Sequence, residues 1–141
     1  MQRGAILLRQ RTRAIDLLYL KIVHYKVVIF QKSRLMTKWF IEYPTGIASK
    51  NLIEKWLDKL TAEQLKSVAK EIKMLEIAGN ELKLPHSRAL SNGLFELRER
   101  RFGYRIYYCF RGNNIILLLA AGNKQSQEKN IKTARERLAI L

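Results

Sequence analysis

The sequence predicts an α+β domain, and three observations support that fold class. Residues 52–60 and 61–79 place apolar side chains at intervals of three and four, which is typical of amphipathic helices. Residues 93–111 contain two stretches in which apolar and polar residues alternate, as in a β-hairpin with one buried face. An uninterrupted apolar run at 115–121 precedes another helical pattern, which indicates a central strand and a closing helix.

A short strand and two helices are expected first. Residues 38–43 (KWFIEY) alternate enough for a strand, which the turn-forming residues 44–46 end. The inward-facing residues of the first helix are predicted to be Leu52, Ile53, Trp56, Leu57 and Leu60. Thr61 and Gln64 have the spacing of a capping box, and Gly79 ends the second helix. Its inward face is predicted to hold Leu65, Val68, Ala69, Ile72 and Leu75. Because the junction is tight, the two helices should form a helical hairpin.

A loop and a hairpin follow these helices. Residues 81–92 are expected to form the loop, from which His86 and Arg88 could reach a functional site. In the hairpin the core face should hold Phe95, Leu97, Tyr104, Ile106 and Tyr108, because a slip of one residue would reverse every side chain. The opposite face should gather Glu96, Arg98, Arg100, Arg105 and Tyr107.

That charged face has two interpretations. One is a solvated surface of paired charges, which is the usual reading of such a pattern. The other is a site in which arginines hold a phosphate and Tyr107 stacks on a base. We favour the second because an aromatic side chain stands among the cations.

The closing helix should bury Ile131, Ala134 and Leu138. The junction before it, residues 122–127, sets Lys124 beside a helix N-terminus, where backbone amides favour an anion. A basic turn in solvent is an equally good interpretation of that junction.

Composition narrows the class of partner. The 141 residues include 27 Lys and Arg against 12 Asp and Glu, a net charge of +15, which favours a polyanion such as RNA, DNA or the ribosome, or an acidic protein. No apolar run has the length of a membrane span, and no signal-peptide pattern is present in the sequence. The single cysteine, Cys109, indicates a reducing cytoplasm. Two distant histidines predict no metal site, and we expect no cofactor.

Residues 1–35 differ from the rest of the chain. They carry eight of the cations and one acidic residue, Asp16, without regular periodicity. Two interpretations remain, a basic N-terminal extension or an artefact of an upstream start codon. We favour a functional domain at 36–141 that begins at Met36, because every patterned element follows this residue.

Four segments in order resemble the RelE/ParE superfamily of bacterial toxins, and within it the HigB-like addiction module killer proteins. They are LPHSRALSNGLFELR, GYRIYY, IILLLAAG and NKQSQEKNIKTARERL, and the similarity covers residues 36 to about 138. It implies a helical pair packed on a curved antiparallel sheet with a C-terminal helix. It also implies a type II toxin–antitoxin system, with many relatives acting as ribosome-dependent mRNA endoribonucleases.

The resemblance also implies roles for particular residues. Arg105 matches the family's catalytic arginine, Arg98 and Arg100 match basic strand positions, and Lys124 matches the basic residue after the last strand. Glu96 departs from RelE but agrees with the ELR sequence of HigB-like members. Asn130 stands where RelE has a catalytic tyrosine, and Asn123 stands where related killers have aspartate.

We therefore predict attack of a ribose 2′-OH on its own 3′-phosphate. The catalytic candidates are Arg98, Arg105 and Lys124, with Glu96 a general base by exclusion, although neighbouring arginines weaken it in that role. The substrate-binding candidates are His86, Arg88, Arg100, Tyr107 and Lys129. The expected partners are mRNA, the ribosome and a helix-turn-helix antitoxin, with no membrane partner. The alternative is a non-enzymatic toxin that inhibits gyrase, as in the ParE branch, or a basic nucleic-acid-binding module.

Overall fold

The computed structural model describes residues 39–44 and 49–141, and for residues 49–51 it describes the backbone alone. The predicted extension at 1–35 and the expected start at Met36 lie outside these residues. The elements are β1 (Phe40–Glu42), α3 (Ser49–Asp58), α4 (Ala62–Ala78), the 3-10 turn η1 (Gly79–Glu81), β2 (Ser87–Ser91), β3 (Leu94–Arg98), β4 (Tyr104–Arg111), β5 (Ile115–Asn123) and α5 (Gln127–Ala139).

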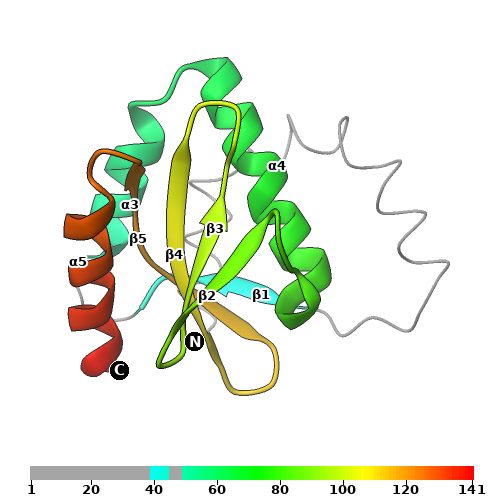
Figure 1. Ribbon diagram of the computed structural model, residues 1–141, viewed down its shortest axis with the longest axis vertical. Helices are drawn as coiled ribbons and strands as arrows, with labels where there is room; N and C mark the ends of the chain where they lie inside the picture. Colours follow the sequence, from blue (N-terminus) through cyan, green and yellow to red (C-terminus); the bar gives the residue numbers. More distant parts are fainter. Residues whose placement is uncertain (1–38, 45–48) are drawn as a thin grey trace, which may run out of the picture.

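The strands form one sheet in the order β1-β5-β4-β3-β2 (Figure 1). The predicted α+β class is confirmed, and the sheet is antiparallel except that β1 pairs with β5 in parallel. The helical hairpin separates β1 from the other strands, so β1 is free to join the edge beside β5. In the central hairpin Phe95 lies opposite Tyr108 and Leu97 opposite Ile106. The predicted register of that hairpin is therefore confirmed.

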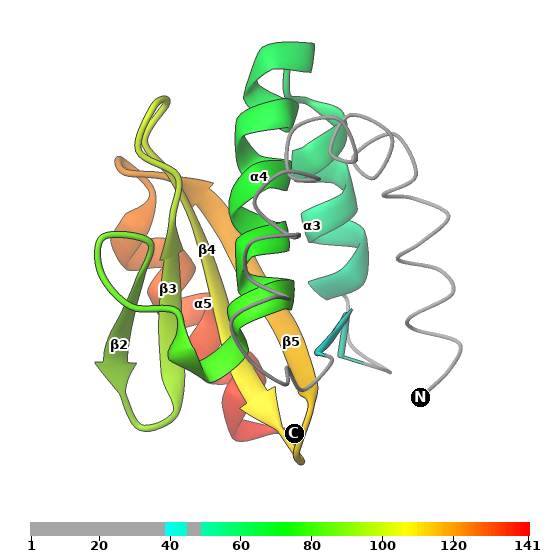
Figure 2. The same cartoon turned by 90° about the vertical axis from the view of Figure 1, so that its right-hand side faces the viewer.

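Helices α3 and α4 cover one face of the sheet, as the turned view shows (Figure 2). The capping box is present: the Thr61 side chain accepts from the Gln64 backbone, and Gln64 Oε1 accepts from the Thr61 backbone at 2.9 Å. Buried Val68, Ala69 and Leu75 of α4 pack with Ile53 and Leu57 against the sheet, as predicted. The inward placement of Leu52 is wrong, since this side chain is 50% exposed. Apolar spacing alone does not separate the centre of a helical stripe from its margin.

Helix α5 packs on the other face of the sheet and buries a second apolar cluster. Tyr107, Cys109, Leu119 and Ala134 are fully or almost fully buried there. Burial raises the pKa of the Cys109 thiol to about 11, so the thiol stays protonated at neutral pH. The prediction of one buried helix face is confirmed by Ala134. Only part of this sheet face is left for a functional site.

The predicted loop at 81–92 is partly wrong, because residues 87–91 form the edge strand β2. This strand pairs with β3 through a turn in which Ser91, Asn92 and Gly93 all have positive φ. Asn-Gly is a strong hairpin signal, since both residues tolerate that backbone region. Apolar and polar residues alternate only weakly in β2, because this strand lies at the edge of the sheet and few of its side chains are buried. Pairing with β3 therefore determines the structure of this segment.

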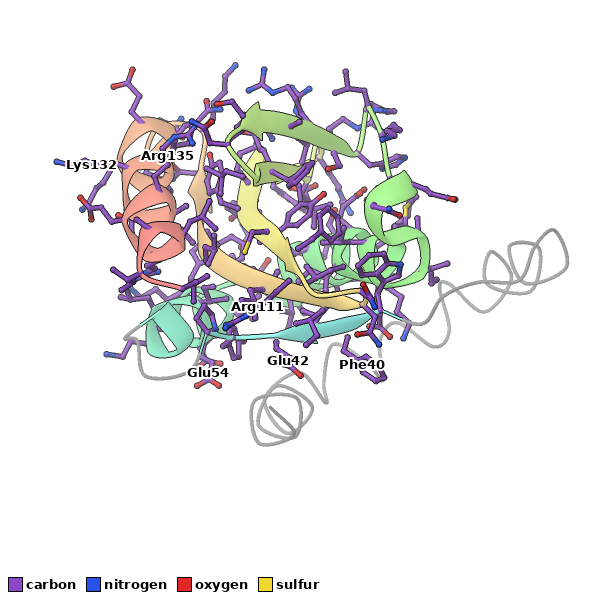
Figure 3. The ribbon with its side chains drawn as sticks, turned by 90° about the horizontal axis from the view of Figure 1, so that it is seen from below. Phe40, Glu42, Glu54, Arg111, Lys132 and Arg135 are labelled. Carbon is purple, nitrogen blue, oxygen red and sulfur yellow. The ribbon has the colours of Figure 1, made fainter. Side chains whose placement is uncertain are left out.

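Two β-bulges lie where α5 meets the sheet. Leu90 is the extra residue in β2 and Leu119 the extra residue in β5. A bulged residue does not share in the regular ladder, so its carbonyl needs another donor. Arg135 donates to the Leu90 carbonyl at 2.9 Å, and the buried Arg137 donates to the Leu119 carbonyl. Seen from below, Lys132 of the same helix points away from the sheet (Figure 3).

Candidate anion-binding site

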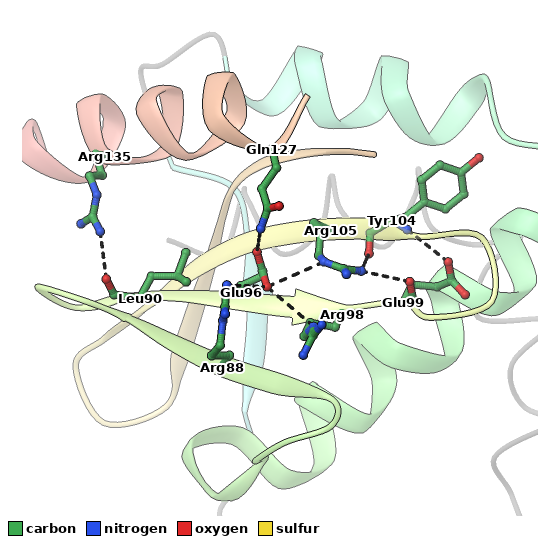
Figure 4. Close-up of polar contacts among 9 residues, drawn as sticks. All are labelled: Arg88, Leu90, Glu96, Arg98, Glu99, Tyr104, Arg105, Gln127 and Arg135. Carbon is green, nitrogen blue, oxygen red and sulfur yellow. Dashed lines mark hydrogen bonds and ion pairs between the residues drawn. The ribbon is translucent and has the colours of Figure 1, made fainter. Parts of the chain in front are cut away.

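A buried carboxylate surrounded by arginines lies on the sheet face that α5 partly covers. Glu96 of β3 is 1% exposed. Its Oε1 lies 3.5 Å from Arg88 Nη2, 3.8 Å from Arg98 Nε and 3.7 Å from Arg105 Nε (Figure 4). Strand pairing explains this meeting, because Arg88 lies opposite Glu96, and Arg98 lies opposite Arg105. We call Arg88, Glu96, Arg98 and Arg105 the arginine cluster.

The arginine cluster has an excess of positive charge. Three guanidinium groups face one carboxylate, which leaves a net charge of +2. None of the three separations corresponds to a hydrogen bond, and the Nε atoms of Arg98 and Arg105 are buried without a hydrogen-bond partner. Glu96 Oε1, which both Nε atoms face, likewise has no hydrogen-bond partner among the described residues. An anionic ligand at the exposed parts of Arg88 and Arg98 would balance the excess charge and accept hydrogen bonds from their guanidinium groups.

Three further hydrogen bonds hold the arginine cluster in place. Arg105 Nη1 donates to the carbonyl of Tyr104 at 3.0 Å and to that of Glu99 at 3.3 Å. Gln127, in the first turn of α5, donates through Nε2 to Glu96 Oε2 at 2.8 Å. All three are drawn in Figure 4. The cluster is thus attached to the β3–β4 turn on one side and to α5 on the other.

Glu99 organises that β3–β4 turn. Its carboxylate is 2% exposed and accepts from the backbone N–H groups of Arg101 at 2.7 Å and Phe102 at 3.0 Å. It also accepts from Ser67 Oγ on α4 at 2.8 Å. A charge run such as RERR is normally solvent-exposed, so the sequence pattern does not distinguish Glu99 from its neighbours. The following Phe-Gly, with positive φ at Gly103, is the only local signal of a structured turn.

Some predicted site residues do not join the arginine cluster. His86 Nδ1 lies 2.9 Å from Glu71 Oε2 of α4. Arg100 follows the end of β3 and lines a groove with Lys66 and Lys70 of α4 instead of lying on the strand face. Its predicted place beside Arg98 is wrong, because the strand ends at Arg98.

Two predicted lysines remain near the start of α5. Lys124 and Lys129 are exposed in and after the turn that precedes the helix. Among the described residues neither makes an ion pair with the arginine cluster. The residue of this region that contacts the arginine cluster is Gln127, which was not among the predicted site residues. The only feature of the sequence that could have indicated Gln127 is its position in a predicted helix next to the basic turn.

The expectation that Tyr107 lies on an open face is wrong. The side chain is 0% exposed because α5 covers it, so it does not present a ring for base stacking. Its hydroxyl lies close to the Glu96 carboxylate. Burial raises the pKa of Tyr107 far above its usual value, and the adjacent charge of Glu96 raises it further. Tyr107 therefore stays neutral beneath the cluster.

A close contact joins β5 to the start of α5. A Cβ added at Gly122 would lie 2.0 Å from Asn130 Nδ2 and 2.6 Å from Ser126 Oγ. Gly122 also lies opposite Arg105 in the sheet.

We expect Gly122→Ala to lower the free energy of unfolding by about 2 kcal/mol, because the methyl group must displace Asn130 and the helix start. Chemical denaturation of both proteins measures this change. The equivalent substitution at the open turn position Gly112 meets no atom within 4 Å, although its positive φ brings some strain. A Gly122→Ala protein as stable as wild type would contradict this prediction.

Among residues 39–44 and 49–141, no group of three His, Cys, Asp or Glu side chains has the arrangement of a metal site. Within the same residues no helix combines the length and apolarity needed to span a bilayer.

A helical hairpin and a closing helix on opposite faces of a five-stranded sheet define a small α+β domain of the RelE-like type. Residues 55–139 match the family described as Phage derived protein Gp49-like (DUF891), and the chain belongs to that family. It is also similar to an uncharacterized protein of Haemophilus influenzae, with 35% identity over 86 residues. That similarity covers 58% of this chain and 81% of the relative. All members of the arginine cluster and Gln127 lie within the matched region.

Proposed function

We propose that this protein is the toxin of a type II toxin–antitoxin system and a HigB-like member of the RelE/ParE superfamily. Membership of the Gp49-like family supports the broader part of this proposal, since these proteins are commonly such toxins. In our proposal the toxin acts in the cytoplasm, and residues 36–141 carry the activity.

The proposed reaction is cleavage of mRNA bound to the ribosome. The ribose 2′-oxygen forms a bond to the adjacent phosphorus, the bond from phosphorus to the 5′-oxygen breaks, and the proton of the 2′-OH is balanced by one gained by the leaving oxygen. The phosphate acquires extra negative charge during this step. Fixed cations in a site with little water stabilise such charge strongly.

One observation carries the proposal: Arg88, Arg98 and Arg105 converge around the single carboxylate of Glu96, which leaves a net charge of +2. These are the groups that a pentacovalent phosphate would need. Lys124 and Lys129 are assigned to contacts with the RNA backbone, because both are exposed at the N-terminal end of α5. His86 and Arg100 are assigned to more distant RNA contacts, outside the arginine cluster.

The proposed partner is a small helix-turn-helix antitoxin with an acidic or amphipathic segment. The chain's charge of +15 favours rapid capture of such a segment. Covering the exposed parts of Arg88 and Arg98 would block the site without a change of fold.

The test is primer extension on an mRNA incubated with the purified full chain, with and without ribosomes. We expect new 5′ ends inside the coding sequence only when ribosomes are present. Arg98→Ala should slow their formation on the order of 100-fold, since a preorganised cationic donor is lost. Lys132→Ala, an exposed change on α5, is the control and should cut at the wild-type rate. Intact mRNA together with inhibited DNA gyrase would contradict the proposal and favour the ParE-like alternative.

A further inference from the structure

The two oxygens of Glu96 have separate surroundings, and this points to a role other than catalysis by proton transfer. Oε2 accepts a hydrogen bond from Gln127. Oε1 is enclosed by Arg88, Arg98 and Arg105. Because the side chain is 1% exposed, a substrate hydroxyl reaches neither oxygen without displacing one of these groups. The position of Glu96 is thus poor for a general base.

We propose that Glu96 and Gln127 are positioning residues for the arginine cluster. In this arrangement Gln127 fixes the carboxylate, and the carboxylate holds the three guanidinium groups around one point. This inference rests on the proposed function, because it assumes that the cluster binds the phosphate that reacts.

Electrostatics explains why a carboxylate is needed there. Three like charges in a partly buried space repel one another, and a single negative charge among them offsets part of that repulsion. The separations of 3.5–3.8 Å are too long for hydrogen bonds, so Glu96 attracts the arginines without occupying their N–H groups. The exposed parts of the Arg88 and Arg98 guanidinium groups consequently remain available to an anion.

Gln127 also fixes the orientation of the Glu96 carboxylate. A carboxylate on a β-strand can rotate about its side-chain torsions, and the hydrogen bond at 2.8 Å selects one orientation. Since Gln127 belongs to the first turn of α5, the geometry of the cluster depends on where this helix begins. Small displacements of groups around a reacting centre lower rates steeply, on the order of 100-fold for about 1 Å.

The test compares Gln127→Leu with the control Gln125→Leu. Leucine keeps a similar size and removes the donor, and Gln125 is an exposed glutamine two residues earlier with no contact to Glu96 in the structure. We expect Gln127→Leu to lower kcat for ribosome-bound mRNA on the order of 10- to 100-fold with little change in KM. The control should stay within about twofold of wild type.

A second measurement does not depend on RNA cleavage. The side-chain Nε–H signals of Arg98 and Arg105 are followed by ¹⁵N NMR while inorganic phosphate is added. In wild type and Gln125→Leu both signals should shift with phosphate, and in Gln127→Leu the shift should need several-fold more phosphate. The backbone spectrum reports whether each variant is folded. If Gln127→Leu does not fold, Gln127→Ala takes its place in the same comparison.

The outcomes separate the two proposals. A wild-type protein that cuts no RNA, but whose arginine signals respond to phosphate in a Gln127-dependent way, overturns the nuclease and supports the positioning role. A Gln127→Leu protein with wild-type rate and wild-type arginine signals overturns the positioning role and leaves the nuclease standing. Wild-type arginine signals that do not respond to phosphate also overturn the positioning role.

Discussion

Replacing Arg105 with lysine is expected to slow the proposed mRNA cleavage by a factor on the order of 10²–10³. Lysine keeps the positive charge but has a single nitrogen. That nitrogen cannot bind the carbonyls of Glu99 and Tyr104 and also face the Glu96 carboxylate as the guanidinium does. The initial rate of cleavage in a reconstituted ribosome assay measures the effect.

The control is Arg111→Lys, the same exchange at the exposed end of β4. It should leave the rate unchanged, which separates geometry at the cluster from the general effect of exchanging arginine for lysine. Thermal unfolding should show both variants folded at the assay temperature. An Arg105→Lys variant whose cleavage rate is within threefold of wild type would mean that positive charge alone is sufficient at this position.

Glu99→Ala is expected to have the largest effect on stability, lowering the free energy of unfolding by about 4 kcal/mol. The substitution removes the acceptor for the Arg101 and Phe102 backbone N–H groups and for Ser67 Oγ. Because the site is 2% exposed, water does not readily replace that acceptor. Urea denaturation followed by circular dichroism provides the measurement.

A graded comparison sharpens this prediction. Glu99→Gln keeps one acceptor oxygen and should lose roughly half as much stability, and exposed Glu136→Ala should change the free energy of unfolding by less than about 0.5 kcal/mol. If Glu99→Ala cost less than about 1 kcal/mol, the turn would be held by its backbone alone.

Periodic apolar patterns predicted most of the fold. The capping box at Thr61, the register of Leu97 with Ile106 and the buried face of α5 are local or short-range consequences of the sequence. The edge strand β2 was missed because its structure comes from pairing with β3 rather than from its own alternation. Parallel pairing of β1 with β5 was also beyond a local pattern, since it joins residues far apart in the chain.

The candidate site was only partly predictable. Alternation along the hairpin placed Glu96, Arg98 and Arg105 on one face, and the structure brings these three together. The same pattern could not show that α5 buries Tyr107, because coverage of a face depends on how another element packs. Nor could it identify Gln127, whose role follows from a contact over 31 positions in the chain.

The two bulges have a consequence for how α5 can leave the sheet. The carbonyls of Leu90 and Leu119 are each bound by an arginine of this helix, and burial lowers the pKa of Arg137 from its usual value. If only the C-terminal part of α5 separated from the sheet, the buried carbonyl at one bulge would therefore lose its donor, while the carbonyl at the other bulge stayed bound. Helix α5 is thus attached to the sheet at two separate bulges. A partner that lifts α5 must break both attachments and, in the same motion, the Gln127 contact that orients Glu96.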